Sequence, residues 1–118
     1  MASRSRGSVI DWSVLREIVG GNDAMRQRLL ASFVVESEQD VCALEAALDA
    51  QKFQAARTVA HQLRGAASTV GALSLAMTAG SLEAPENYGD EGRLTELRSE
   101  LREQMSEVHE RIQSLRSA

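Results

Sequence analysis

The segment Ala60-His61-Gln62-Leu63-Arg64-Gly65 places one of the two histidines of the chain in the middle of a predicted helix. An α-helix turns by about 100° per residue, so the side that each neighbour occupies follows from its distance to His61 along the sequence. The apolar residues gather on the side opposite the histidine: Val59, Leu63, Ala66 and Val70, with Ala56 and Ala67 beside them. Polar and small residues share the side of His61: Gln54, Arg57, Thr58, Arg64, Gly65 and Ser68. The pattern therefore predicts a helix that buries its apolar side and presents His61 to solvent.

Length and composition predict a single all-α domain. The chain has 118 residues, enough for one modest core, with one proline and eight glycines. Leu, Ala, Glu, Arg and Gln, which favour helices, dominate the sequence. The net charge of −4 argues against nucleic acid as a partner, because such an interface needs a concentrated basic face.

The sequence shows no sign of a membrane segment. No apolar run approaches the roughly 20 residues that span a bilayer, and no signal-peptide pattern is present. We therefore expect a cytoplasmic domain without membrane contact. The single cysteine, Cys42, cannot form an internal disulfide, and its apolar neighbours Val41 and Leu44 suggest a buried thiol. It has no other Cys or His in metal-ligand spacing, so no metal site is expected.

Five helices are expected after an N-terminal arm. Residues 1–10 are small, polar and basic without periodicity, and we interpret them as a flexible arm or linker before a domain of residues 11–116. The helices are expected from Asp11 to Gly20-Gly21, from Asn22 or Asp23 to about Ala50, from Phe53 to Val70, from Leu73 to just before Pro85, and from about Arg93 to Ser114. Residues 85–92 are expected to form a loop. Four long helices with short connections predict an antiparallel up-down-up-down four-helix bundle, closed at one end by the short first helix.

The apolar stripes of these helices predict the core. Between residues 73 and 82, the residues expected to face inward are Leu73, Ala76, Met77, Ala79 and Leu82. Three methionines, Met25, Met77 and Met105, have the spacing of helical core residues and need no cofactor to explain them. Ser37 interrupts the stripe of the longest helix. The second histidine, His109, follows the core position Val108, and we expect a structural or solvent-facing role for it.

His61 is the candidate reactive residue. A neutral imidazole is a good nucleophile near neutral pH. Gly65 and Ser68 leave space around it, and Arg64 together with Arg57 supplies positive charge that suits an anion. An exposed glycine inside a helix lowers helix stability by about 1 kcal/mol relative to alanine. The presence of glycine at position 65 therefore suggests a functional reason. These residues favour transfer of a phosphoryl group to and from a histidine nitrogen.

Several short motifs of the chain are shared with a known family: Ala60 to Gly65, Gly71, Leu82-Glu83, Leu15, the turn Gly21-Asn22-Asp23, and Phe33. With these motifs the chain resembles the histidine-containing phosphotransfer (HPt) domain of bacterial multistep phosphorelays, from about Asp11 to Ile112. One position departs from the family, which usually has lysine where this chain has Arg64. A guanidinium forks its donors whereas an ammonium is a point charge, so the phosphate geometry is expected to differ.

The resemblance implies a phosphorelay intermediate. His61 would accept a phosphoryl group from the aspartyl phosphate of one receiver domain and pass it to the aspartate of a second, with Arg64 stabilising the phosphate. Partner-docking residues would be Arg57, Thr58, Gly65 and Ser68. The domain would be a monomeric phosphocarrier without kinase activity, either a stand-alone protein or the C-terminal module of a hybrid sensor kinase. No cofactor is implied for this chain, because the receiver brings its own Mg²⁺.

Two other classes of protein fit parts of the sequence. The dimerisation and phosphoacceptor helices of a sensor histidine kinase carry motifs such as His-Glu-Leu-Arg-Thr-Pro. Here Gln62 replaces the acidic residue and Gly65-Ala66 stands in place of Thr-Pro, and no ATP-binding segment follows. The second alternative is a helical adaptor without chemistry.

Overall fold

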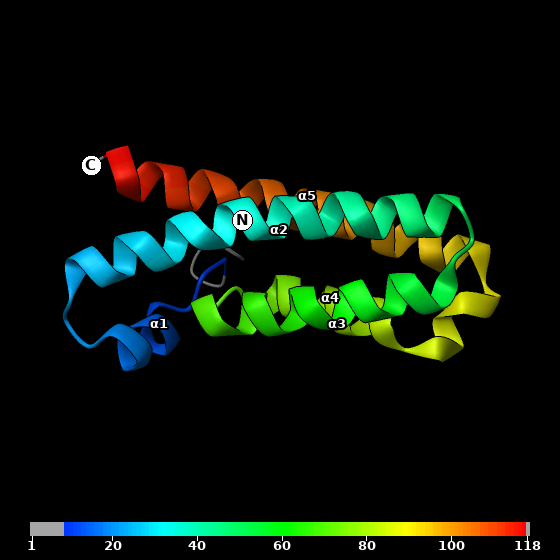
Figure 1. Ribbon diagram of the computed structural model, residues 1–118, viewed down its shortest axis with the longest axis horizontal. Helices are drawn as coiled ribbons and strands as arrows, with labels where there is room; N and C mark the ends of the chain where they lie inside the picture. Colours follow the sequence, from blue (N-terminus) through cyan, green and yellow to red (C-terminus); the bar gives the residue numbers. More distant parts are fainter. Residues whose placement is uncertain (1–8, 118) are drawn as a thin grey trace, which may run out of the picture.

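The computed structural model describes residues 9–117, and in this part of the chain every regular element is helical. The elements are α1 (Trp12–Val19), α2 (Asp23–Asp49), α3 (Phe53–Val70), α4 (Leu73–Glu83), the 3-10 helix η2 (Pro85–Gly89) and α5 (Glu91–Ser117). Figure 1 shows α2 and α5 in one layer, α3 and α4 in the other, and α1 below the N-terminal end of α2. The predicted all-α bundle with a short capping helix is confirmed. Within residues 9–117, no helix is both long enough and apolar enough to cross a membrane.

The helix boundaries follow the capping residues that the sequence predicts. The Asp11 side chain accepts a hydrogen bond from the backbone amide of Ser13 (3.1 Å), and that of Asn22 accepts one from Met25 (2.9 Å). Gly20 (φ 64°) ends α1 in the left-handed region, which glycine adopts without steric cost. Local hydrogen bonds thus fix where α1 and α2 begin and how α1 ends.

Gly71 both ends α3 and connects it to the start of the folded chain. Its φ of 83° is left-handed, and its carbonyl accepts a hydrogen bond from the backbone amide of Asp11 (2.7 Å). A Cβ on Gly71 would collide with the backbone carbonyl of Asp11. Both its conformation and its close neighbour therefore require glycine here.

Helix α3 packs closely against α2 and α4, and three of the five residues on its buried side are alanines. Its buried residues are Ala56, Ala60, Leu63, Ala67 and Val70. Small side chains at a helix interface let neighbouring helices approach closely. The opposite side of α3 carries His61 and is open to solvent, as predicted.

The folded part begins earlier than predicted. Residues 1–8 of the expected arm lie outside the described residues. Ile10, which we placed in the arm, is only 2% exposed, and Val9 packs against the core. Val9 and Ile10 are only two apolar residues at the end of a polar segment. Two residues are too few to show a periodic pattern, so their burial could not be predicted from the sequence.

Some predicted core positions are wrong. Leu73 (41% exposed), Met77 (74%) and Met25 (42%) face solvent, although Met105 is buried as expected. Residues 73–82 are almost all apolar or small, so polarity does not mark the solvent side of α4, and Leu75 and Thr78 are buried instead. Cys42 is likewise exposed. It lies about 200° around α2 from Leu44, which is fully buried.

The connection that we expected to be a loop is mostly helical. Pro85 opens the 3-10 helix η2, where its fixed φ suits the first position. Asp90 then accepts a hydrogen bond from the backbone amide of Arg93 (3.1 Å) and starts α5 two residues before the predicted boundary. The short connection brings α5 back along α4.

Ser37 interrupts the apolar stripe of α2 because it meets His109 of α5 inside the bundle. The Ser37 hydroxyl lies 3.3 Å from Nε2 of His109 and 3.3 Å from the backbone carbonyl of Val34, which accepts its proton. Nδ1 of His109 lies 3.6 Å from a carboxylate oxygen of Glu38. The expected structural role of His109 is therefore a polar contact between α2 and α5.

Stability should fall as the pH falls through the ordinary titration range of His109. Burial lowers the pKa of His109 below 6.5, although Glu38 opposes this shift. As the pH falls below about 6.5, His109 therefore binds a proton more readily in the unfolded chain than in the folded chain. The free energy of unfolding should decrease as a result. Denaturant melts between pH 5 and 8 would measure the slope.

Two variants serve as controls for this pH dependence. His109→Gln should give a flatter profile, because it removes the titrating group. Glu38→Gln should give a steeper one, because it removes the charge that favours the imidazolium. Profiles of equal slope in all three proteins would rule out His109 as the source.

Candidate functional site

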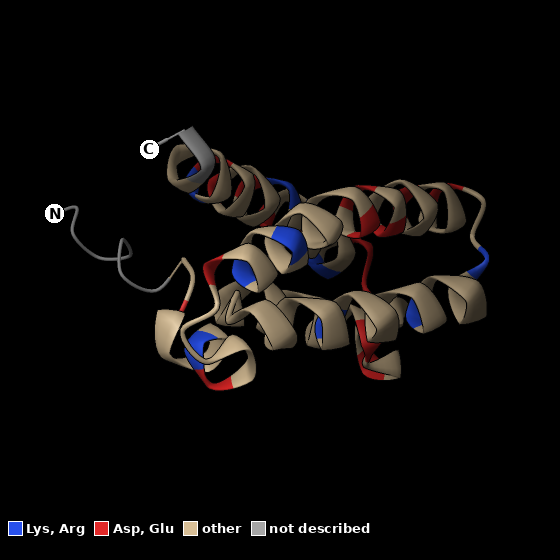
Figure 2. Ribbon diagram, turned by 60° about the vertical axis from the view of Figure 1, so that its left-hand side comes forward, with Lys and Arg blue, Asp and Glu red and all other residues tan. Residues whose placement is uncertain are grey.

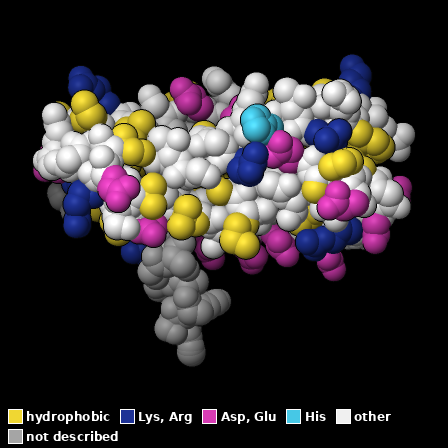
Figure 3. Space-filling view, turned by 90° about the horizontal axis from the view of Figure 1, so that it is seen from below, with side chains coloured by type: hydrophobic (Ala, Val, Ile, Leu, Met, Phe, Trp, Pro, Cys, Tyr) yellow, Lys and Arg dark blue, Asp and Glu magenta, His cyan; other side chains and the backbone are white. Residues whose placement is uncertain are grey.

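His61 protrudes from the middle of α3, and its side chain is 62% exposed. Its neighbours Ala60 and Leu63 are fully buried, so the helix position of His61 is fixed by core packing. Figure 3 shows a histidine side chain at the surface of this face, with a basic and an acidic side chain beside it. The predicted orientation of His61 is confirmed.

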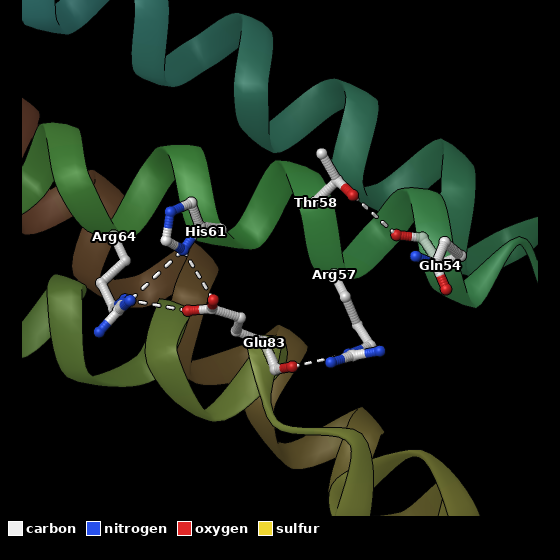
Figure 4. Close-up of polar contacts among 6 residues, drawn as sticks. All are labelled: Gln54, Arg57, Thr58, His61, Arg64 and Glu83. Atoms are coloured by element: carbon white, nitrogen blue, oxygen red, sulfur yellow. Dashed lines mark hydrogen bonds and ion pairs between the residues drawn. The ribbon is translucent and has the colours of Figure 1, made fainter.

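The imidazole makes its shortest contact with Glu83, at the C-terminal end of α4. Nδ1 of His61 lies 2.7 Å from Oε2 of Glu83 (Figure 4). A carboxylate can only accept in such a hydrogen bond, so the proton of the imidazole belongs on Nδ1. The lone pair of the neutral ring is then on Nε2, which Figure 4 shows on the far side of the ring from Glu83.

The sequence pattern does not indicate a role for Glu83 in the site. It appeared only within the Leu82-Glu83 motif, 22 residues away from His61. The two residues meet because α3 and α4 run antiparallel and α4 ends opposite His61 (Figures 1 and 4). The pairing of the two helices, rather than local spacing, brings the carboxylate to the imidazole.

Arg64 lies on the same side of the imidazole as Glu83. Its Nε forms an ion pair with Oε1 of Glu83 (2.9 Å), while Nη2 is 3.3 Å from Nδ1 of His61. With a proton on Nδ1, this second approach is a contact and not a donated hydrogen bond. The carboxylate of Glu83 therefore bridges the imidazole and the guanidinium.

Arg57 contacts Glu83 from the other side. Its Nε donates to the backbone carbonyl of Glu83 (2.8 Å), a group that the end of α4 leaves without a helical partner. Beside it is a hollow of about 240 Å³ lined by Gln54, Arg57, Thr58, His61 and Glu83. The hydroxyl of Thr58 donates to the backbone carbonyl of Gln54 (3.1 Å). This hollow is large enough for a side chain of a partner.

Charge is distributed unevenly around the site. Helix α3 carries two arginines and no acidic residue, whereas α2 and α5 carry most of the acidic residues (Figure 2). Among residues 9–117, no group of three or more His, Cys, Asp or Glu side chains could hold a metal ion. The helix that carries the imidazole thus presents a basic surface within an acidic chain.

The family model of the Hpt domain matches residues 28–118. The chain belongs to the Hpt domain family. Its role is therefore histidine phosphotransfer within a phosphorelay, and the match favours this role over the phosphoacceptor helices of a sensor kinase or an adaptor. Hpt domains are phosphocarriers, and they interact with receiver domains of two-component systems.

A solved structure supports the assignment of the chain to the Hpt domain family. The Hpt domain is similar to histidine-containing phosphotransfer protein B (HptB) from Pseudomonas aeruginosa PAO1, with a TM-score of 0.83 and 29% sequence identity. The similarity covers 92% of this chain and 95% of that one. The comparison with curated protein sequences gave no match.

The remaining predicted site residues of the Hpt domain lie along the exposed side of α3. Thr58 is one turn before His61, and Gly65 and Ser68 are one and two turns after it, all exposed. A Cβ built on Gly65 has no heavy atom within 4 Å. Close approach of a neighbouring helix is therefore not the reason for this glycine.

Replacing Gly65 by alanine should separate function from packing. Alanine removes the helix penalty of glycine and meets open space, so the free energy of unfolding should rise by up to about 1 kcal/mol. The new methyl group should slow phosphotransfer by crowding an approaching receiver, and Gly65→Leu should slow it further. Thermal melts and a transfer assay on the same samples would measure both effects. A lower melting temperature with unimpaired transfer would show that Gly65 serves the fold.

Proposed function

We propose that His61 is the phosphoacceptor of this Hpt domain. It accepts the phosphoryl group from the aspartyl phosphate of one receiver domain and gives it to the aspartate of a second. The observation that carries the proposal is the 2.7 Å contact between Nδ1 of His61 and Glu83, which leaves Nε2 exposed with a free lone pair. The open space at Gly65 also supports it, since a partner needs access to the imidazole.

In the proposed step, the lone pair of Nε2 forms a bond to phosphorus while the bond from phosphorus to the aspartate oxygen breaks. The departing carboxylate keeps the electron pair of that bond, and the imidazole becomes a cation with its proton still on Nδ1. Glu83 lies beside that proton and stabilises the positive charge as it develops. In the second transfer, the aspartate of the other receiver attacks phosphorus, and the imidazole leaves as the neutral Nδ1–H tautomer.

Arg64 acts in this proposal through Glu83. Its ion pair from Nε to Oε1 (2.9 Å) holds the carboxylate so that the other oxygen faces Nδ1. The predicted direct stabilisation of the phosphoryl group would require the guanidinium to leave Glu83 and move toward Nε2. That direct role stays a prediction.

The receiver is proposed to dock on the exposed side of α3. Arg57 and Thr58 line the hollow on the N-terminal side of His61. Gly65 and Ser68 lie on the C-terminal side of His61 along the same helix. The receiver carries an acidic pocket and supplies the Mg²⁺, so the absence of acidic residues from α3 favours its approach. No cofactor is proposed for the Hpt domain itself.

The domain is proposed to be a cytoplasmic monomer without kinase activity, either free or as the C-terminal module of a hybrid kinase. A labelling experiment tests this proposal. The protein is incubated with labelled ATP alone, or with each of a panel of receiver domains phosphorylated by a small phosphodonor. Label should be acquired only from receivers. Self-labelling from ATP would indicate a kinase. If the protein acquired no label from ATP or from any receiver, it would be an adaptor. Size-exclusion chromatography would test the monomer.

A further inference from the structure

Helix α4 contains a glycine, Gly80, that no helix packing requires. It is an interior position of α4, where glycine is the poorest helix former after proline. A Cβ built on Gly80 has one heavy-atom neighbour within 4 Å, namely Cδ of Arg64 at 3.3 Å. No backbone atom or core side chain comes as near. The stem of Arg64 is thus what the missing Cβ makes room for.

The stem of Arg64 that lies over Gly80 leads directly to the guanidinium of the site. Cδ is bonded directly to Nε, and this nitrogen forms an ion pair with Oε1 of Glu83 at 2.9 Å. The other oxygen of the same carboxylate accepts the proton of Nδ1 of His61 at 2.7 Å. The stem of Arg64 thus lies over Gly80, and a series of contacts runs from Arg64 through Glu83 to the imidazole (Figure 4).

We propose that Gly80 is a positioning residue for phosphotransfer. It lets the stem of Arg64 lie close against α4, so that the guanidinium orients the carboxylate of Glu83 and, through it, the proton of His61. This inference rests on the proposed role of His61 as the phosphoacceptor. The glycine touches neither the imidazole nor the phosphoryl group and acts only through Arg64.

Side chains of increasing size at position 80 should displace Arg64 in steps. Alanine places a methyl group 3.3 Å from Cδ, a separation that a small shift of the half-exposed Arg64 can relieve. Leucine cannot share the space with the stem and should separate Nε from Glu83. Gly80→Leu should slow transfer from a phosphorylated receiver roughly tenfold, as the loss of an outer partner of a metal-bound histidine does elsewhere. Gly80→Ala should have a smaller effect.

A double-mutant cycle with Arg64→Ala tests whether the effect passes through Arg64. With alanine at position 64, there is no stem to displace, so Gly80→Leu should change the transfer rate by less than about twofold. Ser74→Ala, at an exposed position of the same helix, is the control for helix propensity and should leave the rate unchanged. A tenfold loss from Gly80→Leu in both backgrounds would overturn the proposal.

Nitrogen-15 spectra of the imidazole provide a readout that a purely structural role of Gly80 would not change. In the wild type, His61 should show a protonated Nδ1 and an unprotonated Nε2, and Gly80→Leu should move it toward a mixture of tautomers. Unchanged resonances would contradict the proposal. This measurement needs no receiver. If the wild type failed to accept phosphate, the function proposed for His61 would fail while the effect of Gly80 on the tautomer remained measurable.

Discussion

Replacing His61 by glutamine should abolish phosphate acceptance while the helical circular dichroism stays unchanged. Glutamine has no nucleophilic ring nitrogen, and its side chain would be as exposed as the imidazole it replaces, so the core is not disturbed. Incubation with a labelled phosphorylated receiver should label the wild type and leave His61→Gln unlabelled. The other histidine, His109, lies half-buried against Ser37 and serves as the control, because His109→Gln should still accept label.

The chemical stability of the label provides a second check. A phosphoramidate is labile in acid and stable in base, so the label on the wild type should be lost on acid treatment. Label that remains on His61→Gln, or that survives acid, would assign the phosphoacceptor to another residue.

Glu83→Gln should slow phosphotransfer about 10- to 100-fold, the cost that the loss of the hydrogen-bond partner of a metal-bound histidine has elsewhere. The amide can accept the proton of Nδ1 through its oxygen or donate to Nδ1 through its nitrogen. The second arrangement moves the proton to Nε2 and removes the nucleophilic lone pair. An amide also lacks the charge that stabilises the imidazolium formed on transfer. Single-turnover rates in both directions, measured with one receiver, would quantify the loss.

Glu86→Gln is the matched control for this substitution. Glu86 is exposed in η2, three residues beyond Glu83, so the control removes the same charge without touching His61. Its transfer rate should remain close to that of the wild type. If both variants were slowed equally, the effect would reflect the overall charge of the docking surface, and Glu83 would have no specific role at the imidazole.

The fold could be predicted largely from the sequence because its signals are local. The helix caps depend on hydrogen bonds and backbone angles within a few neighbouring residues. The caps at helix starts are Asp11 and Asn22, and those at helix ends are Gly20 and Gly71. The exposure of His61 likewise follows from the period of a single helix. Each of these features is complete within about one or two helical turns.

The rest of the site could not be predicted because it depends on which helices pair and in which register. Glu83 and Gly80 come from α4, and neither stands in any regular spacing with His61. The apolar pattern of α4 is too uniform to define its inner face, so it predicts burial for Leu73 and Met77, which are exposed. Without that face, the carboxylate could not be assigned to the imidazole.

The hydrogen bond between Asp11 and Gly71 has a consequence for the order in which the chain folds. It joins residues 60 positions apart, and its acceptor is available only after the end of α3 has turned through Gly71. Closing so long a loop has an entropic cost that increases with the number of residues enclosed. Helix α1 has only eight residues, too few to be stable before docking. We therefore expect α1 to attach last during folding and to detach first in local unfolding, leaving the layer that carries His61 intact.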